Sequence, residues 1–125
     1  MPKTILLVGI GGAIGSIFRY ITHWATTKYF QSSFPFSTFL VNIIGSLLIG
    51  LFIGYLGKYF PENHPLKFLL IVGFCGGFTT FSSFAVENYN LFQNGNQFSA
   101  YIYIIASVIL TITAVGIGNY LTKFL

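Results

Sequence analysis

The residues best suited to ion chemistry in this chain lie at positions 73–84. They read Gly-Phe-Cys-Gly-Gly-Phe-Thr-Thr-Phe-Ser-Ser-Phe, so glycines and hydroxyl side chains interrupt an otherwise apolar stretch. Inside a bilayer, irregular backbone is tolerated only where protein, water or an ion replaces the missing hydrogen bonds. The segment is therefore the first candidate for a permeation path or an ion-binding site, and it predicts a break in the helix that contains it.

The other polar residues of the apolar stretches are neutral hydrogen-bonding groups, among them Thr38 and Asn42. Tyr103, Ser107 and Thr111 have the spacing of one helical face. Such a line is either a seam between helices or a ladder of donors beside a narrow pathway. Amide and hydroxyl donors can replace part of an anion's hydration shell, and no acidic residue lies in the middle of these stretches. The pattern favours an anion over a cation.

Aromatic and charged residues near the segment leave two interpretations open. Phe81 and Phe84 lie three apart, so their positive ring edges could contact a small anion, although spacing alone favours ordinary packing. Arg19 either snorkels to the interface or supplies positive potential to a vestibule. Glu87 either pairs with such a cation or ends its helix in water.

Composition places these residues in a membrane protein. Hydrophobic residues make up 54% of the 125 positions and charged residues 6%, far fewer charges than soluble domains carry. About 20 apolar residues cross a bilayer as a helix. Four stretches meet that length, and the first is expected to be a retained helix rather than a signal peptide. The chain is predicted to be an all-α, single-domain membrane protein over residues 1–125, with spans at about 5–24, 36–57, 68–87 and 99–120.

Several other classes of function are disfavoured. The carboxylates are Glu62, in a loop, and Glu87, at a span end, and acid–base catalysis needs paired titratable groups, so an enzyme is not expected. The single cysteine, Cys75, and the two histidines have no metal-ligand spacing. The net charge of +4 reflects scarce acids and includes no basic cluster, so nucleic acid is not an expected partner.

Charge and small residues predict orientation and assembly. If the helices alternate, Lys3, Lys58, Lys67 and Lys123 share one side with both termini, which favours cytoplasmic termini. The other side holds Lys28 and Arg19. Four packed helices leave little room for a lumen, so a pore is expected between subunits, most simply in a two-fold dimer. Small residues that could mark helix contacts occur at four-residue spacing, at Gly11 and Gly15, at Gly12 and Ser16, and at Ser46, Gly50 and Gly54.

Three motifs in order closely resemble the CrcB/Fluc family of fluoride channels over nearly the whole chain. They are the glycine-rich first span ending in Arg19-Tyr20, the block at 38–46, and the segment at 73–84. The resemblance implies a homodimer of antiparallel four-helix subunits, inserted in both orientations, with two pores. It implies a multi-pass protein of the cell's inner (plasma) membrane that exports fluoride passively and confers fluoride resistance. The lysine bias is stronger than ideal dual insertion suggests.

The same resemblance implies roles for individual residues. The backbone carbonyls of Gly76 and Thr79 would bind a central structural Na⁺, two from each subunit. The fluoride pathway would use Asn42 as an amide donor, Phe81 and Phe84 as aromatic sites, and Tyr103, Ser107 and Thr111 as a polar track. The resemblance supports a role in the pathway less strongly for Thr38 and Glu87. Arg19 would be a vestibule or structural charge.

Two rival classes remain as alternatives. A small multidrug-type, proton-coupled exporter also has four short helices and dual insertion, but it needs a membrane-embedded carboxylate in its first span. The first span here carries Arg19 instead. A non-transporting assembly subunit would explain the packing glycines but not the irregular third span or the polar track.

Overall fold

The computed structural model describes residues 2–125, and these form helices joined by short loops. Two of the elements are not α-helices: η1 is a π-helix and η2 is a short 3₁₀-helix. The elements in chain order are α1 (Pro2–Tyr29), α2 (Phe36–Tyr59), η1 (Lys67–Cys75), α3 (Gly76–Phe78), α4 (Ser82–Gln93), α5 (Gln97–Leu121) and η2 (Thr122–Phe124).

Four helical stretches are long and apolar enough to cross a membrane: Pro2–Tyr29, Phe36–Tyr59, Lys67–Gln93 and Gln97–Phe124. This confirms an all-α membrane protein with four spanning stretches. Each one contains the corresponding stretch expected from the sequence and extends beyond it. The reason is that hydropathy marks the crossing of the hydrocarbon layer, whereas the hydrogen-bonded helix continues into the polar interface.

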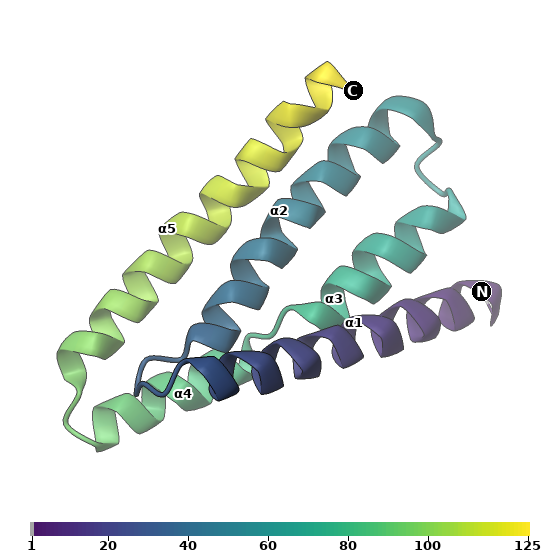
Figure 1. The fold of residues 1–125 in the computed structure, drawn as a ribbon. Helices are drawn as coiled ribbons and strands as arrows, with labels where there is room; N and C mark the ends of the chain where they lie inside the picture. The colour runs from purple at the N-terminus through teal and green to yellow at the C-terminus, as the bar shows by residue number, and fades with distance from the viewer. Residues whose placement is uncertain (1) are drawn as a thin grey trace.

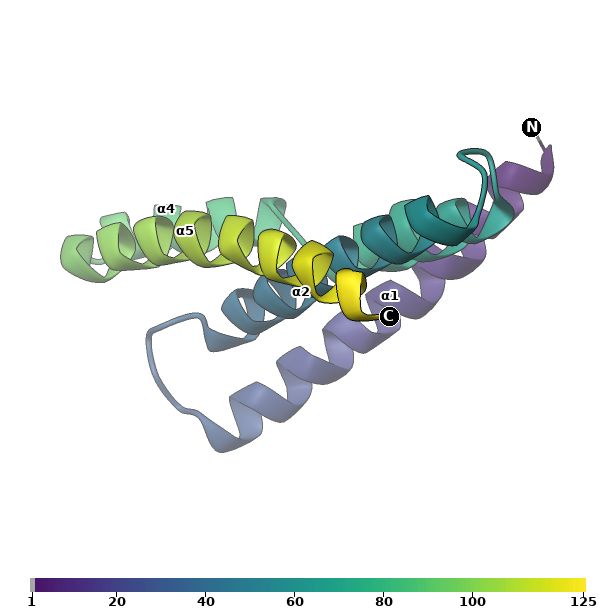
Figure 2. The same cartoon turned by 90° about the horizontal axis from the view of Figure 1, so that it is seen from above.

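The helices form a fan rather than a compact bundle (Figures 1 and 2). Helix α2 packs most extensively on α5, and α1 packs on η1 and α3. Both termini and the loop after α2 lie toward one end, while the loops after α1 and α4 lie toward the other (Figure 1). Consecutive spanning stretches therefore alternate in direction, as the assignment of lysines to two sides assumed.

Glycines allow the backbones of paired helices to approach closely. A Cβ atom on Gly11 or Gly15 would meet backbone atoms of η1 and α3, at Leu69, Phe74 and Phe78. Gly50 faces α5 in the same way. These positions confirm the helix contacts expected from small residues.

The third spanning stretch changes its backbone near its centre. Helix α3 ends at Phe78, and Thr79 is extended with φ −87° and ψ 160°. Regular α-helix resumes at Ser82. The residues between, 79–81, lie beside the middle of α2, where Gly45 faces the Thr79 side chain.

Substitution of Gly118 tests the α2–α5 contact. A Cβ there would lie against the Leu47 carbonyl and 2.8 Å from the Leu51 backbone nitrogen, and overpacking of this kind costs about 1–3 kcal/mol. Gly118→Ala is expected to lower the thermal unfolding midpoint of detergent-solubilised protein. Gly116→Ala, on the same helix with nothing within 4 Å of its Cβ position, is the control. Equal midpoints for the two variants would contradict this packing.

Candidate functional site

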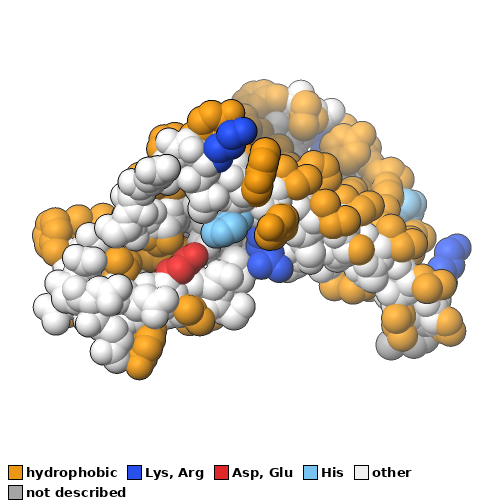
Figure 3. Space-filling model, turned by 60° about the horizontal axis from the view of Figure 1, so that its bottom comes forward, with side chains coloured by type: hydrophobic (Ala, Val, Ile, Leu, Met, Phe, Trp, Pro, Cys, Tyr) orange, Lys and Arg blue, Asp and Glu red, His pale blue; other side chains and the backbone are white. Residues whose placement is uncertain are grey.

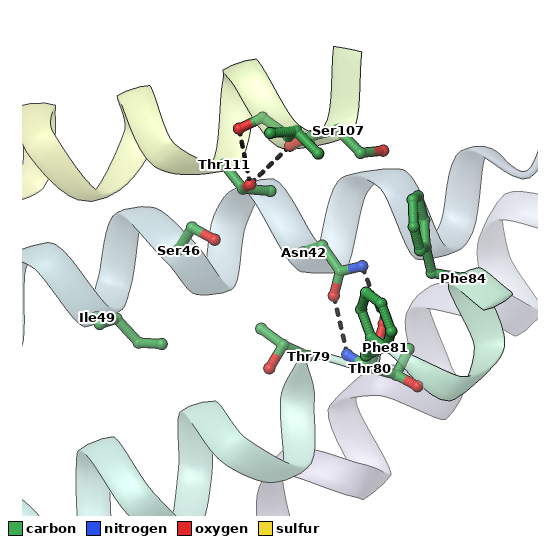
Figure 4. A pocket seen from close by; sticks show the side chains of 10 residues that line it. Asn42, Ser46, Ile49, Thr79, Thr80, Phe81, Phe84, Ser107 and Thr111 are labelled. Carbon is green, nitrogen blue, oxygen red and sulfur yellow. Dashed lines mark hydrogen bonds between the residues drawn. The ribbon is translucent and has the colours of Figure 1, made fainter. Parts of the chain in front are cut away.

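A groove of about 260 Å³ lies where α2, α4, α5 and the segment 79–81 meet (Figure 4). It brings together five residues that the sequence assigned to one pathway: Asn42, Phe81, Phe84, Ser107 and Thr111. Thr38 and Tyr103 lie outside its lining. The complete lining is Asn42, Ser46, Ile49, Thr79, Thr80, Phe81, Phe84, Ser107, Val108 and Thr111.

Asn42 holds the irregular segment through two hydrogen bonds (Figure 4). Its Nδ2 donates to the Thr80 carbonyl oxygen at 3.0 Å, and its Oδ1 accepts from the Thr80 backbone N–H at 2.8 Å. The side-chain amide thus replaces helical partners for both polar groups of one peptide residue. A side-chain amide carries two N–H groups, so one donor of Asn42 is left for the groove.

Two backbone hydrogen bonds of a regular α-helix are missing around Thr79. In an α-helix the N–H of residue i+4 donates to the carbonyl of residue i. The Thr80 N–H would bond Gly76 in that pattern, but it donates to Asn42. The Ser83 N–H would bond Thr79, but it donates to Thr80 Oγ1 at 3.2 Å. The carbonyl oxygens of Gly76 and Thr79 are therefore both deprived of their regular helical donors.

Neighbouring carbonyls in this turn have other partners. Cys75 O accepts from both the backbone N–H and the hydroxyl of Thr79, at 3.0 and 2.8 Å. Gly77 O accepts from Nε of Arg19 at 3.0 Å. Arg19 thus reaches across from α1 to cap the end of α3, which is a structural use of its charge.

The two phenylalanines at the groove differ in exposure. Phe84 is half-buried, and its ring centroid lies 5.0 Å from that of Tyr103. Phe81 is 78% exposed, and its ring centroid lies 5.6 Å from that of Phe84. Both Phe81 and Asn42 line the groove (Figure 4). Phe84 is anchored in the chain's own core, whereas Phe81 is not covered by its own chain.

The hydroxyls of Tyr103, Ser107 and Thr111, which form the polar line on α5, differ in their hydrogen bonding. Tyr103 is fully buried and donates to Glu87 Oε1 at 2.8 Å. Thr111 donates its hydroxyl to the Ser107 carbonyl at 2.6 Å. Among residues 2–125, the buried Ser107 hydroxyl has no hydrogen-bond partner. Of the three hydroxyls, that of Ser107 is the one without a partner, and its residue lines the groove.

A second cavity, of about 350 Å³, contains Arg19, His23, Thr38 and Glu87. On this face, Figure 3 shows acidic, basic and histidine side chains close together. Glu87 fits neither of the two roles expected from the sequence. Its Oε2 accepts from the Thr38 hydroxyl at 2.6 Å rather than pairing with Arg19, and α4 continues past it to Gln93. Two hydroxyl donors, from α2 and α5, satisfy the carboxylate instead.

Sequence reasoning missed some groove residues. The spacing of Ser46 indicates only helix packing, and no sequence signal singles out Ile49 or Val108, yet all three line the groove. Asn42, Ser46 and Ile49 follow the i, i+4, i+7 pattern of one helical face. Extending that face from Asn42 would have found them.

Four spanning helices and a groove of neutral donors and aromatic rings define a multi-pass membrane protein with a polar site at membrane depth. The family described as "CrcB-like protein, Camphor Resistance (CrcB)" matches residues 6–119. The chain belongs to this family, as its motifs indicated.

Curated relatives align with almost the full chain. A protein of Flavobacterium psychrophilum is 47% identical over 97% of this chain and 98% of its own length. One of Azobacteroides pseudotrichonymphae is 43% identical over 99% of both chains. One of Rhizobium leguminosarum is 42% identical over 90% of both chains. Each is named a fluoride-specific ion channel, FluC.

These names bear on the functional classes considered from the sequence. The family is one of ion channels rather than enzymes, which confirms that this chain is not an enzyme. Neither the family nor the names of these relatives support the alternative of a proton-coupled exporter.

Removal of the Asn42 amide should loosen the segment 79–81. Two neutral hydrogen bonds at about 1 kcal/mol each correspond to about thirtyfold faster local opening. Asn42→Ala is therefore expected to speed hydrogen exchange at Thr80 and its neighbours, measured by mass spectrometry on peptides from this region. Ser46→Ala removes a groove side chain from the same face of α2 and should leave exchange unchanged. Equal exchange in the two variants would show that Asn42 does not hold the segment.

Proposed function

We propose that this chain is the subunit of a fluoride-selective channel in the plasma membrane, which lets fluoride leave the cell passively and thereby protects against fluoride toxicity. The observation that carries the proposal is the groove in which Asn42, Phe81, Phe84 and Ser107 meet. Relatives named fluoride-specific ion channels support it, at up to 47% identity.

The chemistry of the groove suits an anion. Ser107 offers a free hydroxyl, and Asn42 offers its second amide hydrogen. Helix α4 begins at Ser82, next to Phe81 at the groove. The first N–H groups of a helix have no partner within it, and they give that end a partial positive charge. No carboxylate lines the groove, so nothing there repels an anion.

Selectivity for fluoride would follow from the mixture of donors and aromatic edges. Fluoride is small and holds its water tightly, so a site that strips this water must replace it with close contacts. Hydroxyl and amide donors supply part of that compensation, and the positive ring edges of Phe81 and Phe84 supply more. Chloride is larger, and it would fit less well where the second subunit of the proposed dimer narrows the groove.

The direction of transport needs no energy source beyond the membrane potential. In acidic surroundings fluoride is protonated to neutral HF. HF crosses the lipid into the cell and ionises in the cytoplasm. A potential that is negative inside drives the anion outward through an open path. A passive channel is therefore sufficient for export.

An antiparallel homodimer with two pores would close the groove. Phe81 is 78% exposed on a single chain, and the groove is open to the surface. A second copy related by a two-fold axis could cover both surfaces at once. Insertion of subunits in both orientations is part of this proposal, although four lysines on one side against Lys28 and Arg19 on the other bias a single chain toward cytoplasmic termini.

A structural Na⁺ fits the interrupted third span. Gly76 O and Thr79 O have lost their helical donors, as described above, and the space beside Gly76 is open, with nothing within 4 Å of its Cβ position. Hard cations prefer oxygen ligands, so two carbonyls from each of two subunits make a chemically suitable set. Bound Na⁺ would supply a fixed positive charge between the two pores and compensate these carbonyls.

The second cavity is proposed as a vestibule. Arg19 and Glu87 both line it, and because two hydroxyl donors hold the Glu87 carboxylate, the Arg19 guanidinium would be the group that attracts anions. Thr38 and Glu87, which line the vestibule, form a hydrogen-bonded set with Tyr103 of α5. This set would position Phe84, whose ring packs on Tyr103.

Anion efflux from liposomes tests the function. Vesicles containing the purified protein are loaded with potassium fluoride or potassium chloride, and valinomycin releases the opposing voltage. Rapid fluoride loss with little chloride loss, without a proton gradient, is expected. Phe81→Ile should reduce fluoride efflux to near the rate of empty liposomes while leaving the dimer intact, because the branched alkyl chain has no positive ring edge.

Phe98→Ile is the matched control, because Phe98 is 77% exposed but lies at the start of α5, outside the groove. It should keep normal fluoride efflux. Normal efflux in Phe81→Ile would remove that ring from the mechanism. No fluoride efflux from well-folded wild-type protein would overturn the channel assignment and lead to an assay of proton-coupled uptake of organic cations.

Removal of sodium tests the proposed cation site independently of fluoride transport. A cation that binds only the folded dimer stabilises it by about 2.7 kcal/mol at one hundred times its dissociation constant. Exchange of Na⁺ for N-methylglucamine should therefore lower the thermal unfolding midpoint by several degrees. Asn42→Ala should reduce this difference, because it loosens the backbone that presents the carbonyls, and Ser46→Ala should not. Identical wild-type midpoints in both cations would refute the site.

A further inference from the structure

A third cavity lies at the opposite end of the molecule from the vestibule. It has a volume of about 490 Å³ and is formed by the last turns of α2, the loop that follows, and the start of η1. None of the residues assigned to the fluoride path, the sodium site or the vestibule lines it. The cavity is therefore separate in space from the proposed conduction path.

The cavity has a polar end and an apolar end, arranged as the headgroup and acyl chains of a membrane lipid are. Ile53, Leu56 and Ile71 supply apolar walls from within two of the spanning stretches. Glu62, His64 and Lys67 lie where one spanning stretch has ended at Tyr59 and the next begins at Lys67. The polar groups therefore lie at the edge of the membrane, and the apolar walls extend into the hydrocarbon layer.

Two of the polar side chains are donors suited to a phosphate. His64 Nδ1 accepts from the Leu66 backbone N–H at 3.2 Å, which in the neutral ring assigns the hydrogen to Nε2. The imidazole packs on Phe60, with ring centroids 4.3 Å apart. Nε2–H of His64 and the ammonium of Lys67 can both donate to phosphate oxygens.

Glu62 adds a negative charge at the polar end of the cavity, opposite in sign to Lys67. Its side chain is exposed, and a carboxylate accepts hydrogen bonds from an ammonium group. A headgroup that carries both a phosphate and a primary ammonium would match the three side chains. Phosphatidylglycerol has no cation for Glu62, and the quaternary amine of phosphatidylcholine has no N–H to donate.

We propose that this cavity is a binding site for a phospholipid with a zwitterionic, primary-amine headgroup, of the phosphatidylethanolamine type. The phosphate binds Lys67 and His64, the amine binds Glu62, and an acyl chain lies along Ile53, Leu56 and Ile71. The occupant is a membrane lipid rather than a soluble phosphate ester, because the apolar walls continue into the spanning stretches.

Native mass spectrometry of the detergent-purified protein tests this. Dioleoyl phosphatidylethanolamine, phosphatidylcholine and phosphatidylglycerol are added at equal concentrations, and retained lipid is counted per chain. The ethanolamine lipid is expected to bind most tightly. Lys67→Gln should weaken its binding about tenfold, the effect of losing one charge-assisted hydrogen bond. Glu62→Gln should abolish the preference for the ethanolamine lipid over phosphatidylglycerol.

Lys123→Gln is the control, since Lys123 belongs to the same end of the chain by its place in η2 but does not line the cavity. It should retain wild-type lipid binding. Equal retention of the three lipids by the wild-type protein would overturn the proposal, as would equal loss in Lys67→Gln and Lys123→Gln. Displacement of the lipid by equimolar glycerophosphoethanolamine would also overturn it, because the acyl chain would then contribute nothing.

Discussion

The paired hydrogen bonds between Asn42 and the backbone of Thr80 are the interaction on which the proposed site depends. At membrane depth the backbone cannot leave its helical bonding unless another group replaces it. One side-chain amide from α2 satisfies both the N–H and the carbonyl of Thr80. This allows α3 to end at Phe78 and α4 to begin at Ser82. The irregular segment between them carries Phe81 at the groove, and it removes the helical donors of Gly76 and Thr79.

The packing of the remaining helices supports this arrangement from both sides. Gly11 and Gly15 let α1 approach η1 and α3 closely enough for Arg19 to reach Gly77. Gly50 and Gly118 let α2 approach α5, which carries Ser107 to the groove opposite Asn42. Much of the apolar surface of the four spans stays exposed on a single chain. Lipid and, in the proposed dimer, a second copy would cover it.

The sequence predicted the fold better than it predicted individual contacts. Hydropathy was sufficient to locate the four spans, because a bilayer requires each span to be apolar and long enough to cross it. Helical periodicity placed Ser107 and Thr111 on one face, and they do share a groove. It could not choose a partner for Glu87, since Thr38 and Tyr103 lie on other helices and their contact depends on packing. Nor could periodicity show that one amide hydrogen of Asn42 donates to the backbone, because that bond exists only where α2 meets the segment 79–81.

An interrupted helix can serve two ions of opposite sign, and this explains why one segment is proposed for both. The end of the first half leaves carbonyl oxygens without donors, which is a negative end suited to a cation. The start of the second half leaves N–H groups without acceptors, which is a positive end suited to an anion. Here Gly76 and Thr79 belong to the first kind and the beginning of α4 to the second, where Thr80 Oγ1 already accepts from the Ser83 N–H. Asn42 lies at the junction and bonds both polar groups of Thr80, so a single side chain satisfies the backbone between the two ends.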